Sequence, residues 1–202
     1  MIGLVILAAG ASRRMGSPKQ LLRFQGKSLV RHSALVGLSS LAAQSIAILG
    51  ANAEDIAPEI EHLALEGKLL KVVYNPEWEE GMASSVRLGI ETLAKEKTKL
   101  EAVIFMLCDQ PFVSAEIINE LITTYRKTQH KIVACTYQSG TTGVPALFSK
   151  EIFPTLLNLK GDVGARKVIQ QFAEDLITIP FSQGDIDLDT PEAYLALKKF
   201  TQ

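Results

Sequence analysis

Glycine residues and cationic side chains occur together in the segment 7–16, which reads Leu-Ala-Ala-Gly-Ala-Ser-Arg-Arg-Met-Gly. Gly10 and Gly16 allow the backbone to turn where a side chain would clash, and the N–H groups of such a turn form a nest for anions. Positive charge comes from three side chains within seven residues, Arg13, Arg14 and Lys19. We therefore expect this loop to bind the phosphates of a nucleoside triphosphate. The alternative is a solvated basic loop around a glycine turn.

Two well-known phosphate-binding patterns do not match this loop. A P-loop has four residues between its glycines and a lysine directly after the second one, whereas five residues separate Gly10 from Gly16 and two more precede Lys19. A dinucleotide-binding loop needs a second glycine, which residues 10–12 lack, and an acidic residue after the second strand. Residues 50–52, at that position, are Gly-Ala-Asn. Both patterns are thereby disfavoured.

Asp109 is the first candidate for a metal ligand. It follows a predicted buried strand and precedes Gln110 and the turn residue Pro111, so its carboxylate is expected to face a ligand beyond the end of the strand. Mg²⁺ prefers oxygen ligands and usually takes one or two carboxylates together with substrate phosphates. The alternative role for Asp109 is to cap the following turn.

A second metal ligand is expected among the acidic residues near the end of the chain. Asp185, Asp187 and Asp189 alternate, which in an extended strand puts them on one face. Asp189 also suits the N-cap of a helix that begins at Pro191. Asp187 is therefore the preferred second ligand, and Asp185 remains open.

Glycine and serine residues occur together again in the segment 80–86. Gly81 permits close approach of a ligand, and Ser84 and Ser85 lie at the predicted start of a helix. Their hydroxyl groups could bind a base edge or a ribose, or Ser84 could simply cap the helix.

Strand and helix patterns alternate along the first two thirds of the chain. We predict strands at 3–7, 45–49, 70–74, 102–107 and 131–136, and helices at 28–41, 54–65, 83–97 and 114–128. The last third predicts a strand at 144–148, a helix at 150–157, a helix that opens near 161–166, a strand at 176–180, an acidic strand end at 185–189 and a final helix from 189 or 190. This alternation indicates one α/β domain, residues 1–202, with a mostly parallel Rossmann-like sheet between two helical layers. Ligands of such sheets bind at the carboxyl ends of the strands.

Composition restricts the class of partner. The chain has 202 residues, 47% of them hydrophobic, and a net charge of −1, so nothing in its bulk charge indicates a nucleic-acid or membrane partner. It begins without a signal-peptide pattern and has no apolar run near the ~20 residues of a membrane span, and we expect a cytoplasmic protein. Cys108 and Cys135 lie in apolar runs and are expected to be buried thiols.

Taken together, these motifs closely resemble the molybdenum cofactor cytidylyltransferases, within the larger group of NTP transferases that includes molybdopterin guanylyltransferase. The resemblance runs nearly the whole length. It rests on the segments 7–16, 75–86, 107–111, 143–145, 161–166 and 187–192, together with Lys19 and residues 21–22. It implies the fold of the nucleotide-diphospho-sugar transferases and transfer of CMP from CTP to molybdopterin, with Mg²⁺ or Mn²⁺ as cofactor.

The resemblance also implies roles for single residues. Arg14 and Lys19 would contact the phosphates, Asp109 would hold the metal, and Ser85 would contact cytosine. Ala9, where guanylyltransferases usually have glycine, favours CTP over GTP. The expected nucleotide-binding residues are Leu7, Ala8, Ala9, Gly10, Ser12, Arg13, Arg14, Gly16, Lys19, Asn75, Gly81, Ser84, Ser85 and Asp109. The expected substrate-binding residues are Gln110, Pro111, Gly143, Pro145, Gly161, Asp162 and Gly164.

Several alternatives stay open at this point. The acceptor could be a sugar phosphate or an isoprenoid precursor, the nucleotide could be GTP, or the chain could be an NAD(P)H-dependent reductase. A cofactor chaperone without catalytic activity is a further alternative. We expect a monomer or weak homo-oligomer, with a molybdoenzyme as a partner to test.

Overall fold

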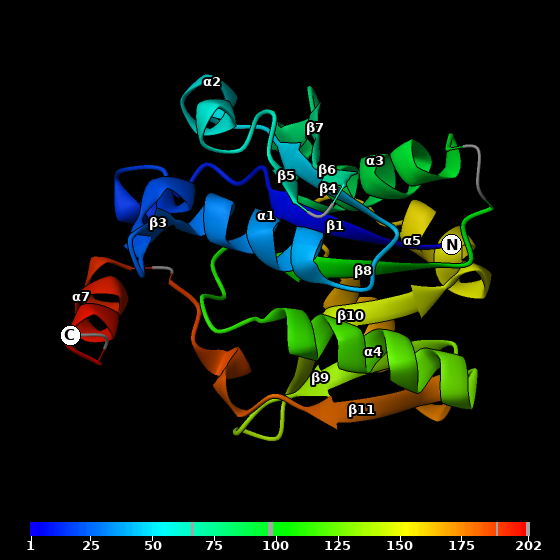
Figure 1. The fold of residues 1–202 in the computed structure, drawn as a ribbon. Coiled ribbons are helices and arrows are strands. Elements are labelled where there is room, and N and C mark those ends of the chain that lie inside the picture. The colour runs from blue at the N-terminus through cyan, green and yellow to red at the C-terminus, as the bar shows by residue number, and fades with distance from the viewer. Residues whose placement is uncertain (66, 97–98, 189, 201–202) are drawn as a thin grey trace.

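The computed structural model describes residues 1–65, 67–96, 99–188 and 190–200. For residues 198–200 it describes the backbone alone. Within these residues the chain builds a central seven-stranded sheet with helices on both faces (Figure 1). The strand order is β7–β4–β1–β8–β10–β9–β11. The strands are β1 (Ile2–Ala8), β4 (Gln44–Leu49), β7 (Lys71–Tyr74), β8 (Ala102–Leu107), β9 (Ile132–Thr136), β10 (Thr142–Ser149) and β11 (Leu176–Pro180).

The sheet is mostly parallel, as predicted. β4 and β8 pair in parallel with β1, β7 pairs in parallel with β4, and β11 with β9. β10 is antiparallel to both of its neighbours, β8 and β9, because a short hairpin connects it to β9. The chain builds the sheet outward from β1 to β4 and β7, and then crosses to the other side of β1 for β8. The strand order therefore reverses between β1 and β8, where ligands of open α/β sheets bind.

Two helical layers cover the sheet because its strands are apolar on both faces. Helices α1 (Leu29–Ser39) and α4 (Ala115–Thr128) pack on one face, with Leu38 and Leu121 in the same apolar cluster as Leu4. Helices α3 (Met82–Ala94), α5 (Phe153–Leu157) and α6 (Ala165–Gln171) cover the other face, around Val5 and Phe105. The predicted three-layer class is confirmed. None of the described helices is long and apolar enough to cross a membrane.

The predicted helix at 54–65 is wrong. Helix α2 (Ala53–Ile56) ends after one turn and continues as the 3₁₀ turn η3 (Ala57–Glu59), which contains Pro58. A hairpin of β5 (Ala64–Leu65) and β6 (Lys68–Leu69) follows. Proline lacks the N–H that a helix needs, which explains why the apolar periodicity does not extend the helix.

The predicted acidic strand at 185–189 is also wrong. Residues 182–185 form the 3₁₀ turn η7 (Ser182–Asp185), and residues 186–188 pair with no strand. Asp189 lies outside the described residues. The final helix, α7, spans Pro191–Phe200, and its first turn is capped by Thr190, whose hydroxyl oxygen accepts from the Ala193 N–H at 3.3 Å. The alternation of acidic residues therefore does not reflect a strand.

Candidate active site

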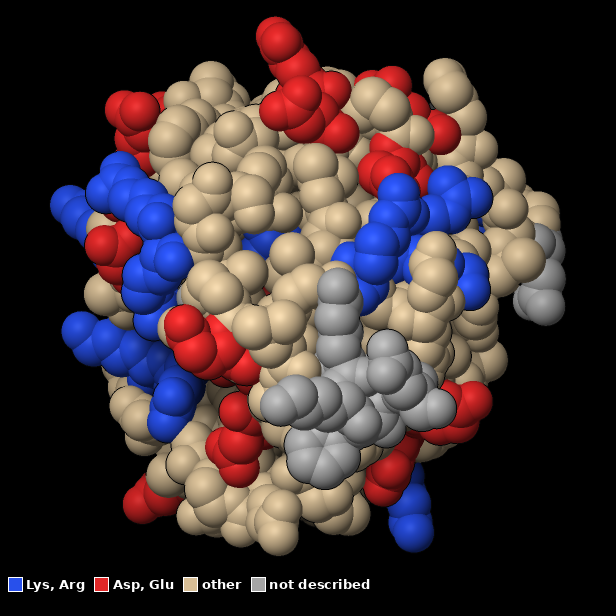
Figure 2. Space-filling view, turned by 90° about the vertical axis from the view of Figure 1, so that its left-hand side faces the viewer, with Lys and Arg blue, Asp and Glu red and all other residues tan. Residues whose placement is uncertain are grey.

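A cavity of about 460 Å³ opens at the carboxyl ends of β1 and β8, where the strand order reverses. Figure 2 shows this side of the molecule, with lysine and arginine side chains on both sides of the middle of the face. The predicted site residues that line the cavity are Leu7, Ala8, Ala9, Gly10, Ser12, Arg13, Lys19, Gly81, Ser85, Asp109 and Asp162. The prediction missed seven further lining residues, Ala11, Gln20, Trp78, Glu79, Met82, Leu107 and Cys108.

The loop after β1 holds its shape through two left-handed residues. Ser12 has φ = 53° and Gly16 has φ = 66°, and they flank the 3₁₀ turn η1 (Arg13–Met15). The Met15 N–H donates to the Ser12 carbonyl at 2.9 Å. The left-handed conformation favours glycine at position 16. Arg13 lines the cavity, and Arg14 is exposed outside it.

Gln20 holds this loop from inside, and it was not among the predicted site residues. Its side chain is fully buried. Its Nε2 donates to the carbonyls of Ala8 at 2.9 Å and Gly10 at 2.8 Å. Its Oε1 accepts from the Ser12 hydroxyl at 3.2 Å, and that hydroxyl oxygen accepts from the Lys19 N–H at 3.0 Å. The loop is therefore a closed and preorganised ring of polar contacts.

Lys19 and Asp109 form an ion pair on the wall of the cavity. Asp109 is only 5% exposed, and its Oδ2 contacts the Lys19 ammonium. The other carboxylate oxygen, Oδ1, is buried and has no hydrogen-bond partner among the described residues. A buried and unsatisfied carboxylate oxygen is costly unless a cation or donor binds it. Asp109 therefore fits the role of a ligand to a divalent cation.

Asp185 and Asp187, the other candidate metal ligands, are not part of the described lining of the cavity. Asp187 is exposed and does not line the cavity, but the neighbouring Leu188 N–H donates to the Asp109 carbonyl at 3.1 Å. The Asp185 carboxylate instead accepts from the backbone N–H and the hydroxyl of Ser139, each at 3.0 Å. The described residues contain no cluster of three or more His, Cys, Asp or Glu side chains suited to a metal. A cation here would depend on substrate phosphates for further ligands, as Mg²⁺ often does.

The start of α3 forms the opposite wall of the cavity. Asn75 is buried, and its Nδ2 donates to the hydroxyl oxygens of Ser84 at 2.8 Å and Ser85 at 3.0 Å. Ser84 in turn donates to the Gly81 carbonyl at 2.9 Å. Ser85 lines the cavity, whereas Asn75 and Ser84 lie behind it. Asn75 and Ser84 hold the wall in place, and Ser85 is the serine that a bound base could reach.

A second group of predicted residues lies beside the cavity, around Tyr137. Gln110 donates to the Gly184 carbonyl at 3.0 Å and to the Tyr137 hydroxyl at 3.4 Å. A Cβ atom at Gly143 would lie 2.4 Å from that hydroxyl oxygen, so a larger residue would displace the ring. Gln110 and Gly143 thus belong to one cluster, while Pro111, Pro145, Gly161 and Gly164 are absent from the described lining of the cavity.

Both cysteines are buried and are predicted to be unreactive in the folded protein. Burial raises the pKa of each thiol, Cys108 and Cys135, from 9.0 to about 12. At pH 8 this leaves about a thousandfold less thiolate than in the unfolded chain. We expect a thiol reagent such as Ellman's reagent to label neither cysteine in buffer within minutes, and to label both after denaturation in about 6 M guanidinium. Rapid labelling in buffer that disappears in a Cys108→Ala variant would show that the cavity exposes this thiol.

Comparisons with known proteins find a matching family model and related chains. Residues 4–176 match the model of the MobA-like NTP transferase domain. Nicotine blue oxidoreductase of Paenarthrobacter nicotinovorans is 30% identical over 93% of this chain and 92% of its own length. A "Probable molybdenum cofactor guanylyltransferase" of Natranaerobius thermophilus is 30% identical over 65% of this chain and 58% of its own length.

A solved structure resembles the whole chain. The crystal structure of Rv0371c from Mycobacterium tuberculosis H37Rv covers 98% of this chain and 97% of its own, with a TM-score of 0.79 and 29% identity. A second structure of that protein, in complex with manganese, has a TM-score of 0.74 and 27% identity over the same shares.

Proposed function

The chain belongs to the family of MobA-like NTP transferases, and we propose that it transfers CMP from CTP to the terminal phosphate of molybdopterin. Family membership makes it an enzyme of the nucleotidyltransferase type, with the fold of the nucleotide-diphospho-sugar transferases. The observation that carries the proposal is the cavity at the β1–β8 reversal. It combines a preorganised glycine- and arginine-containing loop, the Lys19 ammonium and a buried Asp109 carboxylate oxygen without a partner.

The proposed reaction is a single in-line displacement. A terminal phosphate oxygen of the acceptor attacks the α-phosphorus of CTP, and the bond between that phosphorus and the bridging α–β oxygen breaks. Pyrophosphate leaves with the bonding electrons. The attacking phosphate is already an anion near neutral pH, because its second pKa is about 6. No general base is then needed, and catalysis rests on positioning and charge neutralisation.

The cationic residues and the carboxylates have different roles in this reaction. We assign Lys19 and Arg14 to the triphosphate, with Arg13 and the loop N–H groups alongside them. Asp109, with Asp187 as the second ligand, would hold Mg²⁺ or Mn²⁺. When bound, the metal would neutralise charge on the phosphates and on the leaving pyrophosphate. The manganese complex of Rv0371c supports a divalent cation in this group of proteins.

The choice of CTP and of molybdopterin rests on fewer residues. Ser85 lines the cavity and supports a contact with the base, and Ala9 stands where the guanylyltransferases usually have glycine. Gln110 and Gly143 beside Tyr137 support an acceptor site next to the cavity. We assign Asp162, which lies on the cavity wall against Gly81, to the same acceptor. The similarity to a protein named as a molybdenum cofactor guanylyltransferase supports the class of acceptor.

Pyrophosphate release from a panel of nucleotides tests this function. We expect release from CTP with Mg²⁺ or Mn²⁺ only when molybdopterin is present, and at least about tenfold slower release from GTP, ATP and UTP. EDTA should stop the reaction, and excess Mg²⁺ should restore it. Faster release from GTP would make the chain a guanylyltransferase. Release with a sugar phosphate or isoprenoid precursor, but not with molybdopterin, would replace the proposed acceptor.

A second candidate function is an NAD(P)H-dependent reductase. The observation in its favour is the 30% identity to nicotine blue oxidoreductase over nearly the full length of both chains. The tip of β4 opposes it, because residues 50–52 carry no acidic side chain for a nicotinamide dinucleotide ribose. Titration with NADPH under the conditions of the nucleotide panel separates the two functions, since a reductase would bind NADPH and release no pyrophosphate.

A further inference from the structure

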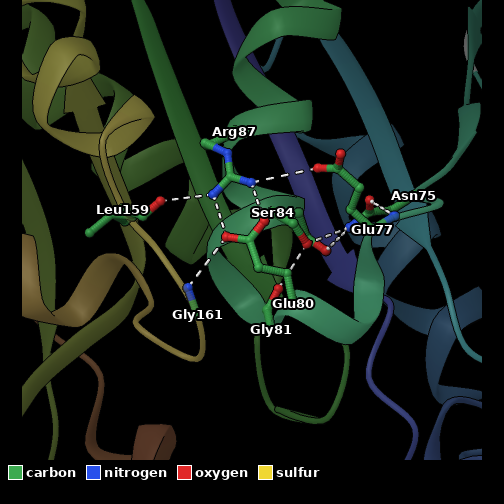
Figure 3. A network of polar contacts seen from close by, with 9 residues as sticks. Asn75, Glu77, Glu80, Gly81, Ser84, Arg87, Leu159 and Gly161 are labelled. Atoms are coloured by element: carbon green, nitrogen blue, oxygen red, sulfur yellow. Dashed lines mark hydrogen bonds and ion pairs between the residues drawn. The ribbon is translucent and has the colours of Figure 1, made fainter.

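Glu80 and Arg87 form a two-point ion pair at the start of α3 (Figure 3). Glu80 ends the 3₁₀ turn η4 (Trp78–Glu80), and Arg87 lies seven residues further on, in the second turn of the helix. The Arg87 Nη1 donates to the Glu80 Oε1 at 2.8 Å, and Nη2 contacts the Glu80 Oε2. Neither residue lines the cavity. A planar guanidinium paired at two points holds one orientation, in contrast to a single surface contact.

The same pair reaches the segment 159–164, which connects α5 to α6 without a helix or strand of its own. The Arg87 Nη1 donates to the Leu159 carbonyl at 2.8 Å, and the Gly161 N–H donates to the Glu80 Oε1 at 3.3 Å. The Gly161 carbonyl, in turn, accepts from the Ala83 N–H at 3.0 Å. The segment is therefore tied at three points to residues 80–87.

The Asp162 carboxylate lies against the start of α3. A Cβ atom at Gly81 would be 2.5 Å from the Asp162 Oδ1 and 2.5 Å from the Gly161 carbonyl carbon, so the segment lies directly against Gly81. Asp162 lines the cavity together with Gly81 and Met82. The loop after β1, residues 9–16, is called the phosphate loop below, and Gln20 holds it separately. It shares none of the hydrogen bonds described for the segment 159–164.

We propose that Glu80 and Arg87 are positioning residues, which hold the segment 159–164 and through it the Asp162 carboxylate on the acceptor side of the cavity. They act on the affinity for the acceptor and leave the affinity for the nucleotide unchanged. The assignment to the acceptor rests on the proposed function. The attachment of the segment does not, and the two parts can be tested separately.

Hydrogen–deuterium exchange of the peptide that covers 159–164 tests the attachment. In Glu80→Gln and Arg87→Met we expect its exchange to be at least about threefold faster than in the wild type. Glu77→Gln is the matched control, because Glu77 is exposed and approaches the Arg87 guanidinium only at 3.7 Å. Unchanged exchange in Glu80→Gln and Arg87→Met, or equal acceleration in Glu77→Gln, would overturn the proposal without reference to activity.

Steady-state kinetics with CTP and molybdopterin test the consequence. We expect Glu80→Gln to raise KM for molybdopterin about fivefold and to keep KM for CTP within about twofold. Arg87→Lys, which keeps the charge but loses the two-point geometry, should lie between the wild type and Arg87→Met. If the pair acts through Asp162, Glu80→Gln should have no further effect on KM in an Asp162→Asn background.

A purely structural role predicts a different result. It would change kcat and both KM values together, or add fully to the effect of Asp162→Asn, and either outcome contradicts the proposal. Failure of the proposed function has its own signature, which is the absence of turnover with molybdopterin in the wild type. In that case the exchange experiment still decides on the attachment, and KM is measured with the acceptor that the nucleotide panel identifies.

Discussion

Replacement of Asp109 by alanine is expected to lower kcat by about 10³-fold or more while the protein stays folded. The Asp109 carboxylate is the buried acid of the cavity, and its Oδ1 has no partner among the described residues. Its loss removes the proposed metal ligand and the ion-pair partner of Lys19. The Lys19 side chain is 19% exposed, so its ammonium keeps access to water. The expected decrease in the free energy of unfolding is therefore only about 1–2 kcal/mol.

Kinetics at varied Mg²⁺, together with thermal unfolding, measure both effects. Asp109→Asn keeps the shape of the side chain and should lose nearly as much activity, which separates loss of charge from loss of volume. Asp175→Asn is the matched control, since Asp175 pairs with Lys131 at 2.9 Å on the surface. This control should retain wild-type turnover. A folded Asp109→Ala variant with full activity would eliminate the metal assignment.

The strands around the cavity could be predicted because burial on both faces makes their sequences almost wholly apolar. The prediction of 102–107 coincides with β8, and that of 3–7 lies within β1. Asp109 could be predicted for the same reason, since a polar residue directly after a buried strand must lie at the end of the sheet. The charged loop after β1 could also be predicted, because its cations and glycines are neighbours in sequence.

Elements outside the sheet were predicted less well. At 54–65 the apolar spacing suited a helix, but Pro58 restricts the chain locally and a hairpin forms instead. At 185–189 the alternation of acidic residues suited a strand, yet the chain turns at η7, where Gly184 packs against the Tyr137 ring. In both places a contact or a restriction beyond the periodic pattern decided the structure.

The residues that support the site had no sequence signal of their own. Arg87 lies inside the predicted helix 83–97 and Glu80 just before it. Neither was assigned a role, because their contacts with Leu159 and Gly161 join segments more than 70 residues apart. Gln20 was not among the predicted site residues, although it is fully buried and lines the cavity. Tertiary hydrogen bonds of this kind depend on the final geometry of the chain and leave no periodicity to detect.

Gln20 is nonetheless the support whose loss should destabilise the phosphate loop most. In Gln20→Leu the carbonyls of Ala8 and Gly10 lose their donor, while the side chain keeps a similar volume. An unsatisfied buried carbonyl costs about 1–3 kcal/mol. Water can replace the donor at the exposed Gly10 but not at the buried Ala8, so we expect the free energy of unfolding to fall by about 1–3 kcal/mol. The loop N–H groups also lose their fixed orientation, and the affinity for CTP with Mg²⁺ should fall about tenfold or more.

Gln129→Leu is the matched control for this effect. Gln129 also donates through Nε2 to two carbonyls, those of Tyr125 at 3.4 Å and Arg126 at 3.0 Å, but it is exposed. Water can replace those two hydrogen bonds, so this variant should lie within about 0.5 kcal/mol of the wild type in urea unfolding. Calorimetric titration with CTP then separates the loop from general stability. A Gln20→Leu variant as stable as Gln129→Leu, with wild-type affinity for CTP, would show that the phosphate loop holds its shape without Gln20.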